Sequence, residues 1–217
     1  MTLSKIRTII LDFDGTLVES VGIKDEAFHT LFSGYPEYLP AIMEYHLSHN
    51  ATVRFEKFRH ITENILIERY DDETKDRLSR RFSELVFRRI VECPFVEGAQ
   101  DLLLFFYERL PVYLVSASPE SELEKILELR NIRKYFTDIY AVPWKKSEAI
   151  RDILKGESGP RKETLFIGDA FEDYEAASTA GISFIGRDSG KSFKNAAVPV
   201  YKNLFEIKEH ICGLYSI

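Results

Sequence analysis

The sequence contains little cysteine and no long apolar stretch. Cys93 and Cys212 are far apart and form no C-x-x-C pair, so we expect two small apolar side chains in a reducing compartment. No apolar run approaches the roughly 18 residues that a membrane span needs. The first residues contain no apolar segment of the kind found in signal peptides. These absences predict a soluble, cytoplasmic protein.

The sequence also has fewer basic than acidic residues. The 217 residues include 29 Lys and Arg against 35 Asp and Glu, a formal net charge of -6. Surfaces that bind nucleic acid need clustered positive charge, so the composition argues against such a partner. With 45% hydrophobic residues, the chain is long enough for a substantial core and for one domain, or one domain with an insertion. A phosphate substrate would therefore need local attraction, from a metal ion or a few Lys and Arg side chains.

The most informative stretch is an apolar run that ends in two aspartates. Residues 9–16 read IILDFDGT, which predicts a buried strand followed by Asp12, Asp14 and a turn at Gly15. In an open parallel sheet, ligands bind outside the carboxyl ends of the strands. Two neighbouring carboxylates repel each other, so they require a cation or a shared proton. Taken alone, such a pair is more often a helix cap and a turn former.

The rest of the chain falls into two patterns. Between residues 19 and 93 apolar residues recur at helical spacing, with breaks near Gly34, Asn50 and Asp71, which predicts an all-helical insertion. After Pro94, predicted strands alternate with helices. This alternation is typical of a doubly wound parallel sheet in an α/β domain made of residues 1–18 and 94–217. The predicted strands are 112–116, 139–142, 164–169 and 182–186, and residues 186–197 are expected to form a polar surface loop.

Further polar residues stand where these strands are expected to end. Ser116 ends the second strand, where a serine usually caps the next helix. Asp169 and Asp173, four residues apart across a strand-to-helix turn, can place two carboxylates beside one cation; the alternative is a cap and a solvated helix residue. Aspartates around a dianionic phosphate need a fixed positive charge. Either Lys145 or Lys146 can supply it.

Two motifs in this order point to a known family. D-x-D-G-T at 12–16 and G-D-x-x-x-D at 168–173 resemble the motifs of the haloacid dehalogenase (HAD) superfamily, most of whose members are Mg2+-dependent phosphohydrolases. The resemblance is closest to the branch of phosphoglycolate phosphatases and β-phosphoglucomutases, which have a helical cap after the first motif. It implies a Rossmann-like core, a cap over residues 19–93, and Mg2+-dependent hydrolysis of a small phosphorylated metabolite.

The resemblance also implies a role for each acidic residue. Asp12 attacks phosphorus to form an aspartyl-phosphate and binds Mg2+. Asp14 protonates the leaving oxygen, then activates water, and its main chain contacts the metal. Asp169 binds Mg2+ directly, and Asp173 supports it.

A second group of residues is implied to bind substrate. Thr16, Ser116 with the adjacent Ala117, and Lys146 would hold the phosphoryl oxygens, since Lys146 fits the third motif better than Lys145. Arg54 matches a position where the β-phosphoglucomutase-like branch often has an arginine facing the active site. A guanidinium there suits a carboxylate or a second phosphate on the substrate. The alternative is that Arg54 lies on a solvated helix face.

Departures from the family pattern leave some assignments open. Glu19 stands where the family usually has Asp, and Glu97 replaces a frequent Pro, which affects only the subfamily. Asp14 argues against a 2-haloacid dehalogenase, a branch that lacks the second aspartate. A phosphomutase of the β-phosphoglucomutase type shares every motif and remains the alternative. A non-catalytic binding protein would be expected to have lost an aspartate or the lysine. The sequence predicts neither the substrate nor the oligomeric state.

Overall fold

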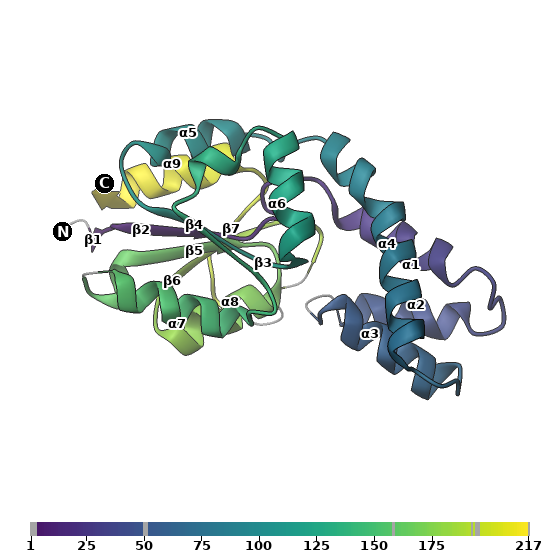
Figure 1. Ribbon diagram of the computed structural model, residues 1–217. Coiled ribbons are helices and arrows are strands. Elements are labelled where there is room, and N and C mark those ends of the chain that lie inside the picture. Colours follow the sequence, from purple (N-terminus) through teal and green to yellow (C-terminus); the bar gives the residue numbers. More distant parts are fainter. Residues whose placement is uncertain (1–3, 50–51, 158, 192, 194–195, 217) are drawn as a thin grey trace. The chain divides into compact units, whose positions relative to one another are not determined.

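The fold is taken from a computed structural model (Figure 1), in which the chain divides into two compact units. One unit combines residues 1–19 with 94–217, and the other is formed by residues 20–93. The structure describes residues 4–49, 52–157, 159–191, 193 and 196–216.

The first unit is built on a six-stranded sheet whose neighbouring strands are all parallel. In sheet order, the strands are β4 (Asp138–Val142), β3 (Val112–Pro119), β2 (Thr8–Leu11), β5 (Thr164–Gly168), β6 (Ser183–Arg187) and β7 (Val200–Tyr201). Strands are added first on one side of β2 and then on the other, so the order reverses between β2 and β5. The predicted doubly wound α/β fold is confirmed, and ligands of such sheets bind at this reversal.

Helices cover both faces of this sheet (Figure 1). α7 and α8 pack on one face, and α5 and α9 lie together on the other. α6 packs against β3 and β4. The helix bounds are α5 (Ala99–Tyr107), α6 (Glu120–Leu129), α7 (Lys146–Gly156), α8 (Phe171–Ala180) and α9 (Leu204–Leu214). The remaining short elements are β1 (Ser4–Lys5), β8 (Tyr215–Ser216), and the 3-10 helices η2 (Arg133–Tyr135) and η3 (Arg161–Glu163).

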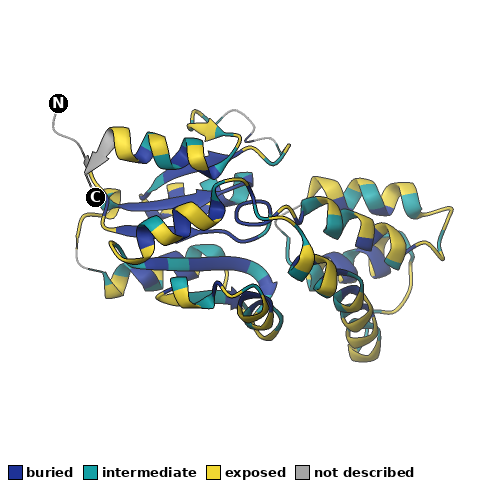
Figure 2. Cartoon of the chain, turned by 90° about the horizontal axis from the view of Figure 1, so that it is seen from above, coloured by how far each residue is buried: buried dark blue, intermediate teal, exposed yellow. Residues whose placement is uncertain are grey.

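The central strands are buried along their whole length, as Figure 2 shows in dark blue for the sheet. Strands covered on both faces need apolar residues at every position rather than at alternate ones, which explains the continuous apolar run before Asp12. On one face Ile10 and Phe166 pack with Ile150, Ala177 and Phe184. Burying one such large side chain contributes about 1.5–3 kcal/mol.

The second unit is all helical. Its elements are α1 (Val21–Leu31), α2 (Leu39–Ser48), α3 (Arg54–His60), the π-helix η1 (Ile61–Ile65) and α4 (Asp72–Glu92). Phe28 is the centre of an aromatic core, with ring centroids 5.5 Å from Phe58 and 5.0 Å from Phe82. Asp71 caps α4 by accepting a hydrogen bond from the Thr74 N–H. The expected break near Asn50 lies outside the described residues. No helix in the described part of the chain is long and apolar enough to cross a membrane.

Two local predictions are wrong. The second predicted strand should end at Ser116, but β3 continues to Pro119, with a shift in its register against β4 between Val115 and Pro119. Ser116 therefore lies inside the strand, which excludes the alternative that it caps α6. The segment after Gly186 is more than a polar surface loop. Arg187 is buried at the end of β6, and the Phe193 ring packs on Phe184. An average polarity over a segment does not show which single side chains turn inward.

Candidate active site

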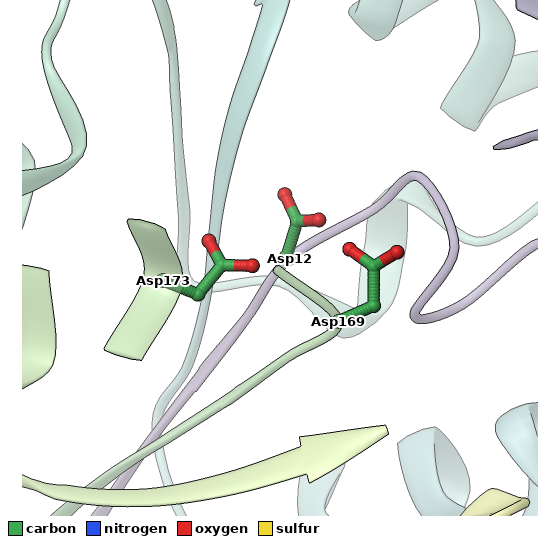
Figure 3. A group of neighbouring side chains, drawn as sticks. All are labelled: Asp12, Asp169 and Asp173. Atoms are coloured by element: carbon green, nitrogen blue, oxygen red, sulfur yellow. The ribbon is translucent and has the colours of Figure 1, made fainter. Parts of the chain in front are cut away.

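Asp12 and Asp169 stand at the carboxyl ends of two neighbouring strands. Asp12 follows β2 and Asp169 follows β5, and the Asp12 N–H donates to the Ile167 carbonyl over 3.0 Å. In Figure 3 these two carboxylates gather with that of Asp173, and carboxylate oxygens of the three residues lie within 4.8 Å of one another. All three residues are buried. The fold therefore brings three of the four predicted metal-site aspartates together at the switch point of the sheet.

Asp173 reaches the cluster from the first turn of α8 because Gly168 has no side chain. A Cβ on Gly168 would lie 2.6 Å from the Asp173 Cβ, closer than two carbon atoms can approach. The Asp173 Oδ2 accepts a hydrogen bond from the Ala170 N–H over 3.0 Å. Since Asp173 is fully buried, the alternative of a solvated helix residue is wrong, and the glycine of the motif has a packing reason.

Lys146 links two of the carboxylates. Its Nζ donates to Asp12 Oδ1 over 2.9 Å and also to Asp173 Oδ1. Burial alone would lower the pKa of Lys146, but Asp12 and Asp173 raise it well above its usual range, so the ammonium is charged. The neighbouring Lys145 is exposed. The structure thus brings Lys146, and not Lys145, to the cluster.

A further lysine, which sequence reasoning missed, contacts the third carboxylate. The Lys191 Nζ donates to Asp169 Oδ2 over 2.7 Å. This residue lies in the segment that the sequence predicts to be a polar surface loop, and no motif or periodicity marks it. Only its position in the fold could have identified it.

The charges of the cluster do not balance. Burial raises the pKa of Asp12 to about 7, although Lys146 opposes this effect, and burial also raises the pKa of Asp169. When all three carboxyl groups are ionised, they outnumber the two ammonium groups, and the resulting negative charge would repel a phosphate. Carboxylate oxygens at this spacing are the ligands that Mg2+ prefers. The donor set therefore fits a Mg2+ ion.

The hydroxyl groups near the first motif form a separate set. The Asp14 carboxylate, which the described residues place outside the group of three, accepts from the Ser118 Oγ over 3.1 Å. The Ser116 Oγ accepts from the Ser118 N–H over 3.2 Å, and Ala117 lies between them in β3. The Thr16 Oγ1 is buried with no hydrogen-bond partner among the described residues. Buried polar atoms normally have partners, so an unpaired hydroxyl beside the aspartates suits a ligand oxygen.

Arg187 holds the turn of the first motif. Its guanidinium forms a two-pronged ion pair with Glu19, at 2.5 and 3.1 Å, and donates to the Gly15 carbonyl over 3.0 Å. Such planar pairs fix geometry as well as charge. The departure at Glu19 thus retains a carboxylate that pairs with a buried arginine, and sequence reasoning did not find this arginine.

Arg54 lies in the helical unit and packs within it. Its Nη2 donates to the Ser83 Oγ over 3.0 Å, and its guanidinium carbon lies 5.4 Å from the centre of the Phe82 ring. The residue is half-buried. The expected contact of Arg54 with the substrate stays a prediction.

A doubly wound sheet with buried aspartates at its switch point and a helical insertion after the first strand defines a class of α/β enzymes. A family model described as haloacid dehalogenase-like hydrolase matches residues 9–187. The chain belongs to this family, and the predicted resemblance is confirmed.

Individual relatives are distant in sequence. A phosphoglycolate phosphatase of Pseudomonas fluorescens is 24% identical over 193 residues, which cover 85% of this chain and 70% of the relative. A hydrolase from Pseudomonas syringae has a TM-score of 0.76 at 21% identity and covers 97% of this chain and 100% of its own. A HAD hydrolase from Bacillus subtilis, solved bound to magnesium, has a TM-score of 0.72 at 17% identity, with coverages of 96% and 99%. The two solved structures share the fold.

Proposed function

We propose that this protein is a Mg2+-dependent phosphatase that hydrolyses a small phosphorylated metabolite through an aspartyl-phosphate. The observation that carries the proposal is the buried cluster in which Asp12 meets Lys146, Asp169 and Asp173. Phosphoryl transfer needs a positioned nucleophile and positive charge around the phosphoryl oxygens, and this cluster offers both. Membership of a hydrolase family and the phosphatase names of relatives support the same conclusion.

The chemistry takes two steps. In the first, an Asp12 oxygen bonds to phosphorus while the bond to the leaving oxygen breaks, and Asp14 gives that oxygen a proton. In the second, water attacks phosphorus, Asp14 accepts a proton from the water, and the bond between phosphorus and Asp12 breaks to release inorganic phosphate. The hydrogen bond from Ser118 to Asp14 holds the acid-base group in place.

The phosphoryl oxygens would be held by groups around Asp12. Lys146 already lies within hydrogen-bond distance of the nucleophile, and the Thr16 hydroxyl is unpaired among the described residues. Ser116 and the main chain of Ala117 complete this set as the family pattern implies. Together they would orient the phosphoryl group for attack.

Asp12 and Asp169 would hold the Mg2+ ion together with the main-chain oxygen of Asp14, and Asp173 would orient Lys146. When bound, the ion would offset carboxylate charge and stabilise charge on the phosphoryl oxygens. The helical unit, assigned as the cap domain, would contact the rest of the substrate.

The test is phosphate release from p-nitrophenyl phosphate and phosphoglycolate with Mg2+ or with EDTA. Wild-type protein should release phosphate only with Mg2+, and Asp12→Asn should lose this activity while it keeps its thermal transition. Asp101→Asn, a change at an exposed aspartate, should behave as wild type. After an acid quench, the peptide containing Asp12 should carry a phosphoryl group. Full activity of Asp12→Asn would overturn the proposal, and transfer of phosphate to a second hydroxyl instead of water would favour a phosphomutase.

A further inference from the structure

The ammonium of Lys191 meets a carboxylate that is almost completely buried. The side chain of Lys191 is 19% exposed and that of Asp169 is 1% exposed, with 2.7 Å between Nζ and Oδ2. Exposed ion pairs contribute little because water screens them, whereas this pair is largely shielded. The geometry therefore makes Lys191 a partner of the buried Asp169 carboxylate.

The chain on both sides of Lys191 is anchored to the α/β unit. The Asp188 N–H donates to the Tyr201 carbonyl over 2.8 Å, which ties the segment to β7. The Phe193 ring is buried, with its centroid 5.8 Å from that of Phe184. These contacts anchor Asp188 and Phe193 to the α/β unit, and between them the Lys191 ammonium reaches the buried carboxylate of Asp169.

Each of the two lysines in the cluster pairs with different carboxylates. Lys146 bonds Asp12 and Asp173, while Lys191 bonds Asp169. A divalent cation that binds Asp12 and Asp169 must therefore displace the Lys191 ammonium from Asp169 or bind beside it. Both outcomes cost free energy, because one breaks a shielded ion pair and the other places two positive charges close together.

We propose that Lys191 is an internal counter-ion of the metal site, which neutralises Asp169 while no metal is bound and competes with Mg2+ for that carboxylate. This inference rests on the proposed Mg2+ site. It has two consequences that a merely structural lysine would not have. Mg2+ binds less tightly than the carboxylates alone would allow, and the metal-free protein is more stable than it would be without the lysine.

The first experiment measures Mg2+ binding by isothermal titration calorimetry, without substrate, on protein treated with EDTA and desalted. Lys191→Met should lower the Kd for Mg2+ by about tenfold, since a hydrogen bond between charged groups is no longer in competition. Lys155→Met is the matched control, because it removes the same charge and breaks an exposed pair with Asp152. Its Kd should equal that of wild type. Lys191→Gln, which is neutral but keeps a donor, should bind as tightly as Lys191→Met.

The second experiment records thermal unfolding with and without Mg2+. Lys191→Met should unfold at a lower temperature than wild type without metal, and saturating Mg2+ should remove the difference. If both Lys191 variants bind Mg2+ with the wild-type Kd or more weakly, the inference is wrong and the metal site stands. If no variant and no wild-type protein binds Mg2+, the metal site itself is wrong and the inference falls with it.

Discussion

Asp12 and Asp14 are two residues apart, yet their surroundings differ. Asp12 is buried and contacts the Lys146 ammonium, whereas Asp14 is half-buried and contacts the Ser118 hydroxyl. Two carboxylates in different environments suit different tasks. In the proposed mechanism, the ammonium of Lys146 would orient Asp12 for attack on phosphorus, and the hydroxyl of Ser118 would orient Asp14 for proton transfer.

Asp14→Asn tests this division of roles. General acid-base catalysis contributes about 10²–10⁴-fold, so turnover of an alkyl phosphate such as phosphoglycolate should fall by that factor. The loss should be smaller for p-nitrophenyl phosphate, whose leaving group needs no protonation. Steady-state kinetics on both substrates give the comparison. Equal losses would mean that Asp14 acts through the metal and not by proton transfer.

Lys146→Ala and Lys145→Ala differ by one position but should differ strongly in effect. Without Lys146 two buried carboxylates lose their partner, so phosphatase activity should disappear, and the metal-free protein should lose about 3–5 kcal/mol of stability. Lys145→Ala, at an exposed site, should match wild type in phosphatase activity and in the stability of the metal-free protein. Activity assays and urea unfolding measure the two effects. A loss confined to Lys145→Ala would reverse the assignment.

The helical elements contain their own buried polar network. The Lys57 ammonium on α3 lies 3.1 Å from His46 Nδ1 on α2, and His46 Nε2 lies 2.9 Å from Asp25 on α1. An ammonium can only donate, so Nδ1 accepts and Nε2–H donates to Asp25. Burial lowers the pKa of His46, the bond to Asp25 partly opposes this, and Lys57 lowers it further. The histidine therefore joins three helices in its neutral form.

This network predicts that acid weakens the helical unit. The folded-state pKa of His46 lies below that of the unfolded chain, about 6.5, so the unfolded chain binds more protons between the two values. The contribution of His46 to the free energy of unfolding should therefore fall as the pH drops below about 6.5. Urea unfolding from pH 8 to pH 5 should give the same pH dependence in wild type and in His49→Gln, a change at an exposed histidine at the end of the same helix. His46→Gln should be less stable at pH 8, and its free energy of unfolding should lack the part of the pH dependence that comes from His46. If the free energy of unfolding of His46→Gln depends on pH as that of wild type does, the role of His46 is refuted.

Arg54 on α3 bonds to Ser83 on α4, and it is also the residue predicted to bind the leaving group of the substrate. If Arg54 contacts the substrate, Arg54→Ala should reduce kcat/KM for phosphoglycolate. The reduction should correspond to a loss of transition-state stabilisation of about 1.5–3 kcal/mol, the range for hydrogen bonds to charged groups. Hydrolysis of p-nitrophenyl phosphate should hardly change. Ser83→Ala removes the bond to Arg54 and is the control for helix packing. Equal losses on both substrates would show that Arg54 affects activity through the packing of the cap, and no loss on either would show that it has no role in catalysis.

At the scale of the whole molecule, metal binding and folding should be coupled. A ligand at 100 times its Kd stabilises a protein by about 2.7 kcal/mol, which for a chain of this size is a rise in Tm of about 5–10 °C. Mg2+ alone should produce this rise in differential scanning fluorimetry, and EDTA should abolish it. Asp169→Asn should show no Mg2+-dependent rise. A rise of the same size in that variant would place the metal elsewhere.

The sequence by itself determined the fold class, the helical insertion and the two acidic motifs. These depend on local patterns: a continuous apolar run for a buried strand, helical spacing between residues 19 and 93, and fixed spacings such as G-D-x-x-x-D. Each pattern is contained in a short stretch of chain. The local physics of helices and strands is therefore sufficient to reveal it.

Only the tertiary structure decided which lysines enter the site. Lys146 and Asp12 are 134 residues apart in the chain, and the choice over Lys145 depends on which face of α7 turns towards the sheet. Lys191 and Arg187 carry no sequence signal, because a single charged residue in a polar segment looks the same whether it meets water or a buried carboxylate. Contacts between distant segments exist only once the sheet has formed, and no local pattern encodes them.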